Sequence, residues 1–404
     1  MLMAYYKRLL EDTVKQYLAI FPAIAITGPR QSGKSTLLRE NFLDNYKYVT
    51  FDDPIQVDFF RTDPKGFMKT HSGNVIFDEV QRVQELFHFL KIIIDNNRGK
   101  YGQFILTGSN QFQMHEKITE TLAGRIGLLS LLPFQLLEVP SKLQSDSLLY
   151  GSYPELIARK YKHSKEWFAA YVQNYIERDV RSVANIGNIR DFQRLLFLLA
   201  ARVSQELNMS NMASEIGVTV KTIQRWISIL ENSYLIFLLP PFHKNYGKRI
   251  VKRPKIYFYD TGLVCYLTGI RTLEILKQGP LAGPIFENLI VADIKKDIFH
   301  QNKDMHLYYF RSNLGIEIDL IIENIEQRIF HFIEIKNSYT FRPKMIKPLK
   351  KLMDFETKSI FETQKFKIQG TLLYQGEEQL NLSENIFCKN YLTFLINFSR
   401  GQYP

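Results

Sequence analysis

Glu334 and Lys336 have residue types and a spacing that could do chemistry together. They lie two apart in the apolar, β-branched stretch "FIEIKNSYTF" (332–341). On a strand, side chains two residues apart point to the same face. A carboxylate and an ammonium on one face can form an ordinary ion pair, or they can belong to a metal-dependent phosphodiesterase site. Residues 332–341 alone leave both interpretations open.

A phosphate-binding loop is indicated near the start of the chain, in "AIAITGPRQSGKSTLL". An apolar strand (23–27) runs into Gly28-x4-Gly33-Lys34-Ser35 and then into a helical pattern, which is the context such a loop requires. The glycines let the backbone curl so that its N–H groups and the helix N-terminus face the phosphates. Lys34 can neutralise the β- and γ-phosphates, while the Ser35 hydroxyl ligates Mg²⁺. The sequence therefore predicts ATP and Mg²⁺ as cofactors. The residues expected at the nucleotide are Gly28, Pro29, Arg30, Gln31, Ser32, Gly33, Lys34, Ser35 and Thr36.

Two further apolar segments end in polar residues that suit the same site. "NVIFDEV" ends in Asp78 and Glu79, where the aspartate would associate with magnesium and the glutamate would polarise the attacking water. "YGQFILTGSN" ends in Thr107, Ser109 and Asn110, which suit γ-phosphate sensing at the carboxyl edge of a parallel sheet, although a plain strand-to-loop transition would look similar. Strands and helices alternate through about residue 140, which predicts a parallel α/β sheet.

A helix-turn-helix pattern occupies the middle of the chain. The stretch "NMASEIGVTVKTIQRWISILENSYLIFLLPPF" predicts a short helix, a turn at Gly217, and a second helix opened by Thr219. Apolar residues recur at helical spacing in the second helix, which predicts its buried face. The residues of that face are Val220, Ile223, Ile227 and Leu230.

The outer face of the second helix carries residue types that contact phosphates and base edges from recognition helices. The segments that follow predict a β-hairpin wing, whose tip in "HKNYGKRIVKRPK" is rich in Lys and Arg and contains no acid. Such a tip favours a phosphate backbone and salt-sensitive binding. Winged helices also bind proteins, so a protein partner stays an alternative. The candidate DNA contacts are Lys221, Gln224, Arg225, Lys248, Arg249, Lys252 and Arg253.

The order of these motifs resembles the AAA+ ATPases that carry an uncharacterised C-terminal domain, the DUF4143 group. "GPRQSGKST", "FDEVQRVQELFHFLK", "FILTGSN" and "LAGRIGLLSLLPF" are followed in the same order by "GSYPE", "YIERDV", "KIYFYDTGL", "IFENLI" and "EIDLIIE…FIEIKNS". The resemblance implies an ATPase joined to a winged helix and a nuclease-like fold. Within it, Glu177, Arg178 and Asp179 either contact the nucleotide or form an ion-pair cluster between domains. Arg125 is either a trans-acting arginine finger in a ring or a structural anchor.

The last third of the chain is similar to the core of PD-(D/E)XK nucleases, with a helix, three strands, a helix and a strand in that order. The resemblance implies metal ligands at Asp319 and Glu334, a catalytic lysine at Lys336, and an auxiliary helix acid at Glu287, with Glu317 as a substitute. An ion pair of Glu334 and Lys336 alone would leave Asp319 as a semi-buried charge without a cation, which a divalent metal would resolve. We therefore expect these side chains to converge at the edge of the sheet.

Composition and charge restrict the class of protein. A chain of 404 residues exceeds what one core usually organises, and no apolar run reaches the roughly 18–20 residues that cross a bilayer. The net charge of +11 suggests a polyanionic partner. The first residues show no small-residue cleavage site of a signal peptide, and Cys265 and Cys388 have no disulfide or zinc spacing. We expect a cytoplasmic protein with no membrane partner.

These observations predict an α/β chain in three parts. They are an AAA+ P-loop ATPase domain (1–140), a helical linker with a winged helix-turn-helix (141–265), and a PD-(D/E)XK nuclease-like α/β domain (266–404). The predicted function is Mg-dependent ATP hydrolysis coupled to action on DNA, with a homo-oligomer as one option and metal-dependent nuclease activity as an open question. The predicted catalytic residues are Lys34, Glu79, Asp319, Glu334 and Lys336. The alternative is a nucleotide-gated switch that binds a protein partner, with an inactive nuclease-like domain.

Overall fold

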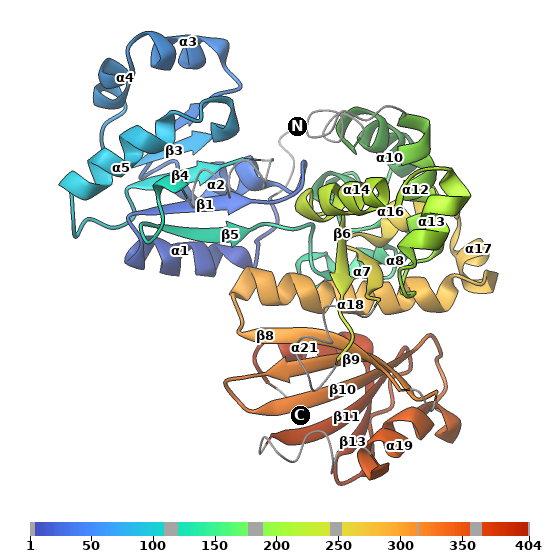
Figure 1. Ribbon diagram of the computed structural model, residues 1–404. Coiled ribbons are helices and arrows are strands. Elements are labelled where there is room, and N and C mark those ends of the chain that lie inside the picture. The colour runs from blue at the N-terminus through green and yellow to red at the C-terminus, as the bar shows by residue number, and fades with distance from the viewer. Residues whose placement is uncertain are drawn as a thin grey trace.

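The computed structural model describes residues 5–108, 120–176, 189–242, 253–312, 315–355 and 366–402. Its elements form a parallel sheet with helices, then a mainly helical region, and then a mixed sheet (Figure 1). The predicted α/β class and the order of its parts are confirmed. Within the described ranges, every helix is too short or too polar to cross a bilayer.

The first sheet has five parallel strands in the order β2-β3-β4-β1-β5. All residues of β1, β3 and β4 are buried, because apolar clusters cover both faces of this parallel sheet. The strands are β1 (Ala23–Thr27), β2 (Lys47–Thr50), β3 (Val75–Asp78), β4 (Phe104–Thr107) and β5 (Ile126–Ser130). The helical elements are α1 (Leu10–Ile20), α2 (Lys34–Phe42), α3 (Pro54–Thr62), α4 (Pro64–Thr70), η1 (Val80–Arg82) and α5 (Leu86–Asn96).

The middle region packs short helices around one apolar cluster and includes a two-stranded antiparallel hairpin. Its helical elements are η2 (Leu136–Glu138), α7 (Ser141–Gln144), α8 (Ser147–Tyr150), α9 (Pro154–Ala158), α10 (Ser164–Tyr171), η3 (Val172–Ile176), α12 (Ile189–Ala201), α13 (Met209–Ile216), α14 (Val220–Asn232), α16 (Thr261–Leu267) and α17 (Leu273–Gln278). The hairpin strands are β6 (Ile236–Leu239) and β7 (Lys255–Phe258). Most of the predicted tip of the wing (243–255) lies outside the described residues, namely 243–252.

The predicted second helix of the helix-turn-helix is α14, and Thr219 caps it by accepting a hydrogen bond from the N–H of Thr222. Ile223, Ile227 and Leu230 are buried as predicted. The prediction for Val220 is wrong, because this residue is 39% exposed. Val220 is the first residue of α14 and stands almost one turn before the helix enters the core at Ile223.

Two of the sequence motifs, "GSYPE" and "YDTGL", are interlocked. Asp260 caps α16 and also accepts a hydrogen bond from the backbone N–H of Ser152 at 2.6 Å. A side chain at Gly151 would lie 2.3 Å from the Asp260 carboxylate, and one at Gly262 would lie 2.4 Å from the backbone of Tyr150. Both glycines are therefore needed for this close approach, and the two motifs form one structural element.

The C-terminal sheet has six strands in the order β12-β13-β11-β10-β9-β8, with parallel and antiparallel pairs. The predicted order of helix, three strands, helix and strand is present and is followed by further elements. The strands are β8 (Met305–Arg311), β9 (Glu317–Asn324), β10 (Ile329–Lys336), β11 (Lys367–Tyr374), β12 (Leu380–Ser383) and β13 (Ile386–Asn390). The helical elements are α18 (Ala282–Gln301), η4 (Pro343–Ile346), α19 (Lys347–Phe355) and α21 (Tyr391–Ser399).

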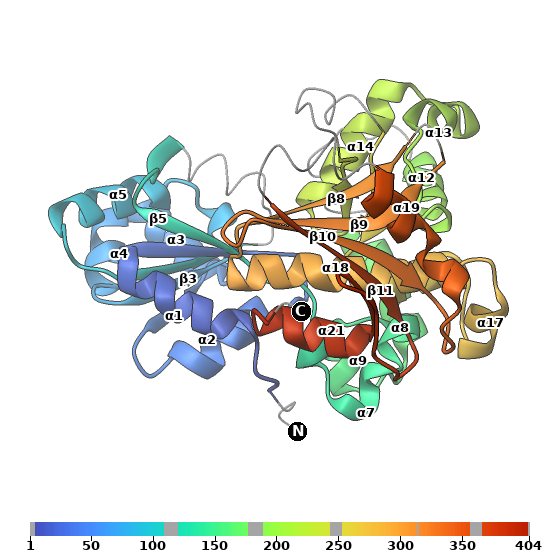
Figure 2. The same ribbon diagram turned by 90° about the horizontal axis from the view of Figure 1, so that it is seen from below.

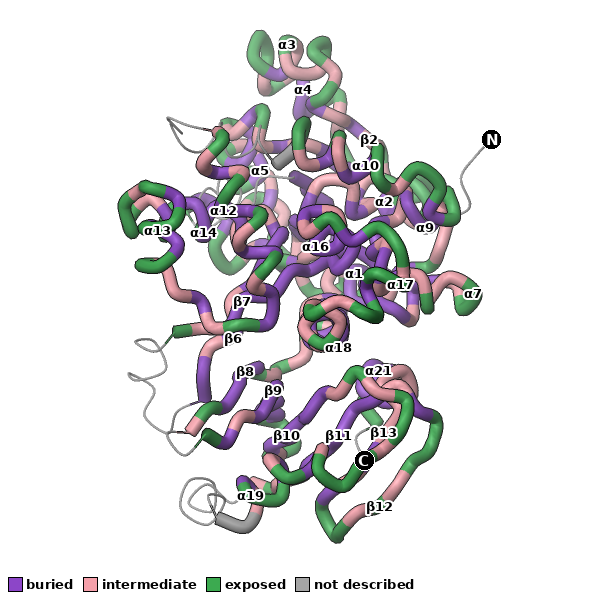
Figure 3. The backbone as a smooth tube through the Cα atoms, turned by 90° about the vertical axis from the view of Figure 1, so that its right-hand side faces the viewer, coloured by how far each residue is buried: buried purple, intermediate pink, exposed green. Residues whose placement is uncertain are grey.

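Helix α18 connects the three regions. It lies beside α21 along one face of the second sheet (Figures 1 and 2), and it also contacts α1, β5 and β7. Most of its residues are buried, as are the central strands of the second sheet, whereas much of α13 faces solvent (Figure 3). Residues at the two ends of α18 can therefore contact different parts of the chain.

Candidate nucleotide and phosphodiester sites

The predicted phosphate-binding loop joins the end of β1 to the start of α2. Its backbone takes positive φ values at Gly28, Gln31 and Gly33, a curl that turns successive N–H groups toward one side. A Cβ at Gly28 would lie 2.1 Å from the carbonyl oxygen of Leu131, so only glycine fits there. Lys34 is buried, and its Nζ donates hydrogen bonds to the carbonyl oxygens of Gly28 and Pro29, each at 2.9 Å.

Asp78, the last residue of β3, is the centre of a hydroxyl cluster. The Ser35 Oγ donates a hydrogen bond to Asp78 Oδ2 at 2.9 Å, and the hydroxyl of Thr107 at the end of β4 donates to Oδ1. Tyr48 on β2 also donates its hydroxyl to Asp78. Burial and this bond raise the pKa of Tyr48 to about 12, so Tyr48 remains a donor at neutral pH. Strand β4 lies between β1 and β3, which brings the three strand ends together.

Glu79 directly follows this cluster and has an unusual backbone. Its φ of 59° and ψ of 42° are left-handed, a conformation that non-glycine residues adopt rarely and often at functional sites. Its carboxylate contacts the side-chain amide of Gln81. The structure therefore places Lys34, Ser35, Asp78, Glu79 and Thr107 around the carboxyl ends of β1, β3 and β4. Ser109 and Asn110, the other predicted sensors, lie outside the described residues.

Two residues that support the loop were not predicted. Arg8 is buried and donates to the carbonyl oxygens of Ser32 (2.9 Å) and Leu132 (2.7 Å), while its Nε lies 3.1 Å from Oε1 of Glu138. The Tyr234 hydroxyl, between α14 and β6, lies 2.8 Å from Thr27 Oγ1 at the end of β1. These contacts join residues up to 207 positions apart, so no local sequence pattern could have identified them.

His300, near the end of α18, ties that helix to the chain that leaves β5. Its Nε2 accepts a hydrogen bond from the backbone N–H of Leu132 at 3.0 Å. Burial lowers the pKa of His300 to about 3; Arg8 and Lys296 add to this effect, and Glu138 opposes it. The imidazole is therefore neutral in the folded protein at neutral pH.

We expect the His300→Gln variant to lose less stability in mild acid than the parent. In the unfolded chain a histidine binds a proton near pH 6.5, which folded His300 does not, so its contribution falls by up to about 1.4 kcal/mol per pH unit below that value. Glutamine can still accept from Leu132 but does not titrate. Urea unfolding between about pH 7.5 and about pH 5.5 should show a smaller decline in the variant.

Asp293 titrates in the same pH range, but it does not alter the comparison between the parent and His300→Gln. Burial raises the pKa of Asp293 to about 7, so its contribution to stability increases as the pH falls through that value, in the opposite direction to His300. This contribution is present in the parent and in the variant. An equal decline in both proteins would contradict the role given to His300.

Arg125 is anchored within the first part of the chain. Its guanidinium forms two hydrogen bonds with the carboxylate of Asp95, at 2.7 and 3.1 Å. This geometry agrees with a role of Arg125 as a structural anchor. To act as an arginine finger, Arg125 would have to release Asp95. Residues 177–179, which were expected either at the nucleotide or in an ion-pair cluster between domains, lie outside the described residues.

The C-terminal cluster brings together the residues predicted there. Lys336 Nζ lies 2.5 Å from Glu334 Oε1 and 3.6 Å from Asp319 Oδ2, and the backbone N–H of Ile335 donates to Asp319 at 2.8 Å. Asp319 thus has a cationic partner without a metal, contrary to the expectation that a metal was needed to compensate it. β9 and β10 are interior strands, so the cluster lies at strand ends and not along an edge strand.

The other carboxylates of the cluster meet a lysine that was not predicted. Lys255, the first residue of β7, lies 3.4 Å from Glu287 on α18 and 2.8 Å from Glu317 on β9. Burial, together with the Asp319 charge, raises the pKa of Glu287 to about 7 and that of Glu334 to about 8. The carboxylates are therefore only partly compensated by the two lysines.

The described ranges contain no group of three or more His, Cys, Asp or Glu side chains arranged to hold a metal ion. One atom of the cluster nevertheless lacks a partner, because Oε2 of Glu334 is buried and accepts no hydrogen bond. Such an atom is costly to bury unless a ligand uses it. Asp319 and Glu334 therefore fit a metal whose other ligands come from water or substrate.

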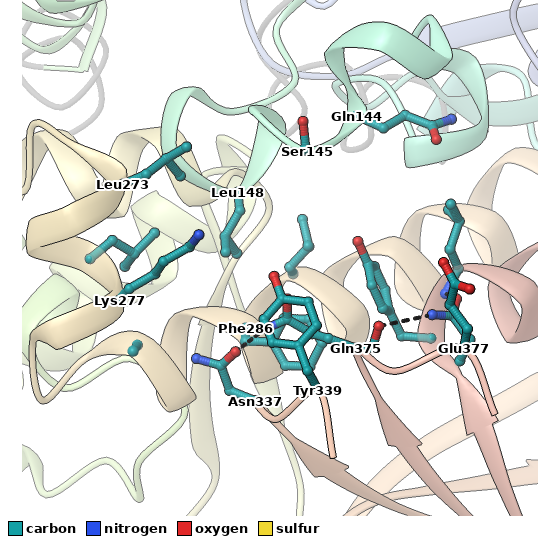
Figure 4. Close-up of a pocket in the computed structure, with 16 residues that line it drawn as sticks. Gln144, Ser145, Leu148, Leu273, Lys277, Phe286, Asn337, Tyr339, Gln375 and Glu377 are labelled. Atoms are coloured by element: carbon teal, nitrogen blue, oxygen red, sulfur yellow. Dashed lines mark hydrogen bonds between the residues drawn. The ribbon is translucent and has the colours of Figure 1, made fainter. Parts of the chain in front are cut away.

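A cavity of ≈ 290 Å³ lies beside the ends of β10 and β11. Figure 4 shows its lining by the aromatic rings of Phe286 and Tyr339 and by polar side chains such as Asn337 and Lys277. Asn337 directly follows Lys336, but no predicted site residue is among the described residues that line this cavity. The cavity is thus separate from the acidic cluster.

The described DNA-contact candidates are all exposed. Lys221, Gln224 and Arg225 lie on the solvent face of α14, and Arg253 precedes β7. The other three candidates, Lys248, Arg249 and Lys252, lie outside the described residues. The structure therefore leaves the α14 face available to a partner.

The five-stranded parallel sheet and its loop define a P-loop fold of the AAA type, which supports nucleotide binding and hydrolysis. Family models agree with this class. The AAA domain family matches residues 21–139, and two domains of unknown function match the rest, DUF8612 at 141–274 and DUF4143 at 282–393. The chain thus contains an AAA-type P-loop domain and a DUF4143 domain, as the resemblance implied.

Two proteins with similar sequences are named as uncharacterized proteins. The uncharacterized proteins Rv2008c of Mycobacterium tuberculosis and Mb2031c of Mycobacterium bovis are each 28% identical over 368 residues, which is 90% of this chain and 79% of theirs. Among solved structures, the Walker-type ATPase PABY2304 of Pyrococcus abyssi is similar, with 14% identity and a TM-score of 0.46. That similarity covers 66% of this chain and 99% of the other.

Proposed function

We propose that this protein is a Mg-dependent ATPase that acts on DNA. The observation that carries the ATPase proposal is the meeting of Ser35, Asp78 and Thr107 at the ends of parallel strands beside the curled loop. Hydroxyl and carboxylate oxygens are ligands that Mg²⁺ prefers, so Ser35 and Asp78 would hold the ion. When bound, Mg²⁺ supplies charge neutralisation at the phosphates.

The remaining residues of the loop have separate roles in this proposal. Lys34 would exchange its two carbonyl acceptors for phosphate oxygens, which bear a full charge and bind an ammonium more strongly. Glu79 would orient and polarise the attacking water, and Thr107 would contact the γ-phosphate. Turnover of ATP in the presence and absence of duplex or branched DNA tests the whole proposal: stimulation by DNA supports it.

The DNA part of the proposal rests on the exposed cationic face of α14. That helix has a continuous buried face and presents Lys221, Gln224 and Arg225 to solvent, as a recognition helix in a winged helix would. The net charge of +11 fits a polyanionic partner. The basic residues at 243–252 would extend this face, on the evidence of the sequence alone.

We expect the double variant Lys221→Glu and Arg225→Glu to bind duplex DNA more weakly. Each lost phosphate contact should lower the slope of log affinity against log salt by about one. Fluorescence anisotropy at several salt concentrations measures both quantities. The matched control is Lys100→Glu with Lys142→Glu, which changes the net charge equally at exposed positions elsewhere. An equal loss of DNA affinity in the control variant would show that α14 is not part of the DNA interface.

For the C-terminal domain we propose a phosphodiester-binding site with metal-dependent cleavage. Asp319 and Glu334 would hold the metal, which activates water when bound, and Lys336 would orient that water or the scissile phosphate. The unpartnered Glu334 Oε2 supports a cationic ligand. Glu287 would tune the charge of the site from α18.

One set of contacts favours a second candidate, the nucleotide-gated switch. Tyr234 links the end of β1 to the α14–β6 junction, and Arg8 links the loop to Leu132 and Glu138. A nucleotide that moves the loop would act on both contacts. DNA binding, or stimulation of turnover by DNA, separates the candidates, because the switch predicts neither. The three-part division at about residues 140 and 265 and the cytoplasmic location belong to the proposal and remain predictions from the sequence.

A further inference from the structure

The cavity beside the ends of β10 and β11 lies where the middle region meets the C-terminal sheet. Its lining comes from α7, α8, α17, α18, the two strand ends and α21 (Figure 4). Its volume of ≈ 290 Å³ is near the lower limit of cavities that bind small ligands, which is about 300 Å³. The cavity therefore suits one ring system of a ligand.

Uncharged groups dominate the lining of this cavity. Among the described residues that line it, Lys277 and Glu377 are the charged ones, and their formal charges cancel. The Phe286 ring packs edge-on against the Tyr391 ring, with the ring centres 5.1 Å apart, and leucine side chains extend this apolar part. An anion such as free phosphate would meet no excess of cations here. The lining favours an uncharged, largely apolar ligand.

Tyr339 is an aromatic residue of this cavity that is 64% exposed. Its backbone is fixed, because a Cβ at Gly376 would lie 2.3 Å from the Tyr339 carbonyl oxygen and only glycine allows this approach. The N–H of Gln375 donates to the carbonyl oxygen of Ser338 at 2.9 Å, and the Asn390 side-chain amide donates to that of Gly376 at 3.0 Å. An exposed ring on a fixed backbone is a surface on which a planar ring can stack.

Two side-chain amides at the cavity have unused hydrogen-bonding atoms. The amide of Gln375 donates to Oδ1 of Asn337 (Figure 4). Within the described ranges, Nδ2 of Asn337 donates no hydrogen bond and Oε1 of Gln375 accepts none. Exchanging nitrogen and oxygen in both amides would still leave one donor and one acceptor. Nucleobase edges present such neighbouring donors and acceptors, whereas a purely apolar ligand would leave both amide atoms unpaired.

The cavity and the acidic cluster are neighbours along two elements. On α18, Phe286 lines the cavity, and the next residue, Glu287, belongs to the cluster. At the end of β10, Lys336 belongs to the cluster, and the next residue, Asn337, lines the cavity. Consecutive Cα atoms are about 3.8 Å apart. A nucleotide with its base in the cavity would therefore have its phosphates close to the cluster.

We propose that the cavity binds one unpaired nucleobase of a DNA strand that lies at the acidic cluster. The Tyr339 ring stacks on the base, and the amides of Asn337 and Gln375 form hydrogen bonds with its edge. The substrate class is DNA with an unpaired base, such as a bulge, a flap or a single-stranded end, because a base inside a duplex cannot enter a cavity. This proposal rests on the proposed action on DNA, whose duplex contacts are assigned to α14.

The test is the affinity of the full-length protein for three labelled DNAs, measured by fluorescence anisotropy in EDTA so that no strand is cleaved. They are a paired duplex, the same duplex with one bulged adenine, and the same duplex with an abasic residue as the bulge. We expect the parent to bind the bulged adenine about 5- to 150-fold more tightly than the abasic bulge, the usual effect of one stacked base. Tyr339→Ala should abolish this preference, and Tyr339→Phe should retain it. The matched control is Tyr101→Ala, at a tyrosine that is 56% exposed and lies outside the cavity, and it should also retain the preference.

Asn337→Ala removes the unused donor and should reduce the preference by itself, which gives a second variant at an exposed position. Equal affinity of the parent for both bulges would overturn the proposal, as would a preference that persists in Tyr339→Ala. The paired duplex judges the proposed function separately. A parent that binds this duplex without preferring the bulged adenine keeps the α14 interface and loses the cavity site. A Tyr339-dependent preference without binding of the paired duplex does the reverse, and failure to bind any of the three DNAs removes both.

Discussion

Lys34→Ala is expected to abolish nucleotide binding at working concentrations of ATP, and with it turnover. The Lys34 ammonium is buried within the loop and is its charged donor to the phosphates in our proposal. Loss of one partner of a buried charged pair costs about 2–5 kcal/mol, which corresponds to roughly 30- to 4,000-fold weaker binding. Calorimetric titration with ATP and a phosphate-release assay measure the two effects.

Glu79→Gln is the matched control, because it should separate hydrolysis from binding. Glutamine has the same length and tolerates the left-handed backbone of residue 79 about as well as glutamate. This variant should bind ATP like the parent and hydrolyse it about 10²–10⁴ times more slowly, the usual contribution of a positioned base. Unchanged turnover in either variant would exclude the present assignment of the nucleotide site.

The loop and the strands around it were predictable because their signals are local. Eight consecutive residues define the phosphate-binding pattern, and the buried strands before and after it are short apolar runs with polar ends. The helix cap at Thr219 was predictable for the same reason, since its partner lies three residues away. Val220 was misplaced because helical spacing gives the apolar face but does not show where along the helix the core begins.

The contacts that connect the parts of the chain could not be predicted. Arg8 and Tyr234 are one arginine and one tyrosine among many, and only the fold brings them to the loop from 24 and 207 positions away. Lys255 is the last residue of the stretch that the sequence assigned to a basic wing tip, yet it is buried against acids from α18 and β9. A charged residue in a basic segment carries no sign of such a partner, because burial depends on tertiary packing.

The expectation for Asp319 rested on the free energy of a buried charge, and it too missed a partner that only tertiary packing reveals. The sequence suggested a semi-buried charge without a cation, which a divalent metal would resolve, because the reach of Lys336 across β9 and β10 was not visible. In the structure Lys336 serves Asp319 and Glu334 together, at 3.6 and 2.5 Å. The presence of a metal must therefore be decided by its chemistry and not by charge compensation.

The Asp319 and Lys336 variants provide that decision. We expect the parent to cleave linear, nicked or branched DNA with Mg²⁺ or Mn²⁺, and Asp319→Ala and Lys336→Ala to lower the rate about 10²–10⁴-fold. Asp319→Asn is the control for folding, since its amide oxygen can still accept the hydrogen bond from the N–H of Ile335 while the charge is lost. It should be as inactive as Asp319→Ala but unfold close to the parent in thermal denaturation.

Each outcome assigns the cluster a different role. Cleavage that persists in both Asp319→Ala and Lys336→Ala would come from another site or from a contaminant, because each variant removes a charge that the mechanism requires. No cleavage by the parent with any of these substrates would leave the domain as a binding scaffold. Lys336 would then act as the permanent counter-ion of Asp319 and Glu334, and Lys336→Ala would lower stability by leaving both carboxylates without their nearest cation. Cleavage lost in both variants, with folding retained in Asp319→Asn, is the result that a metal-dependent phosphodiester site requires.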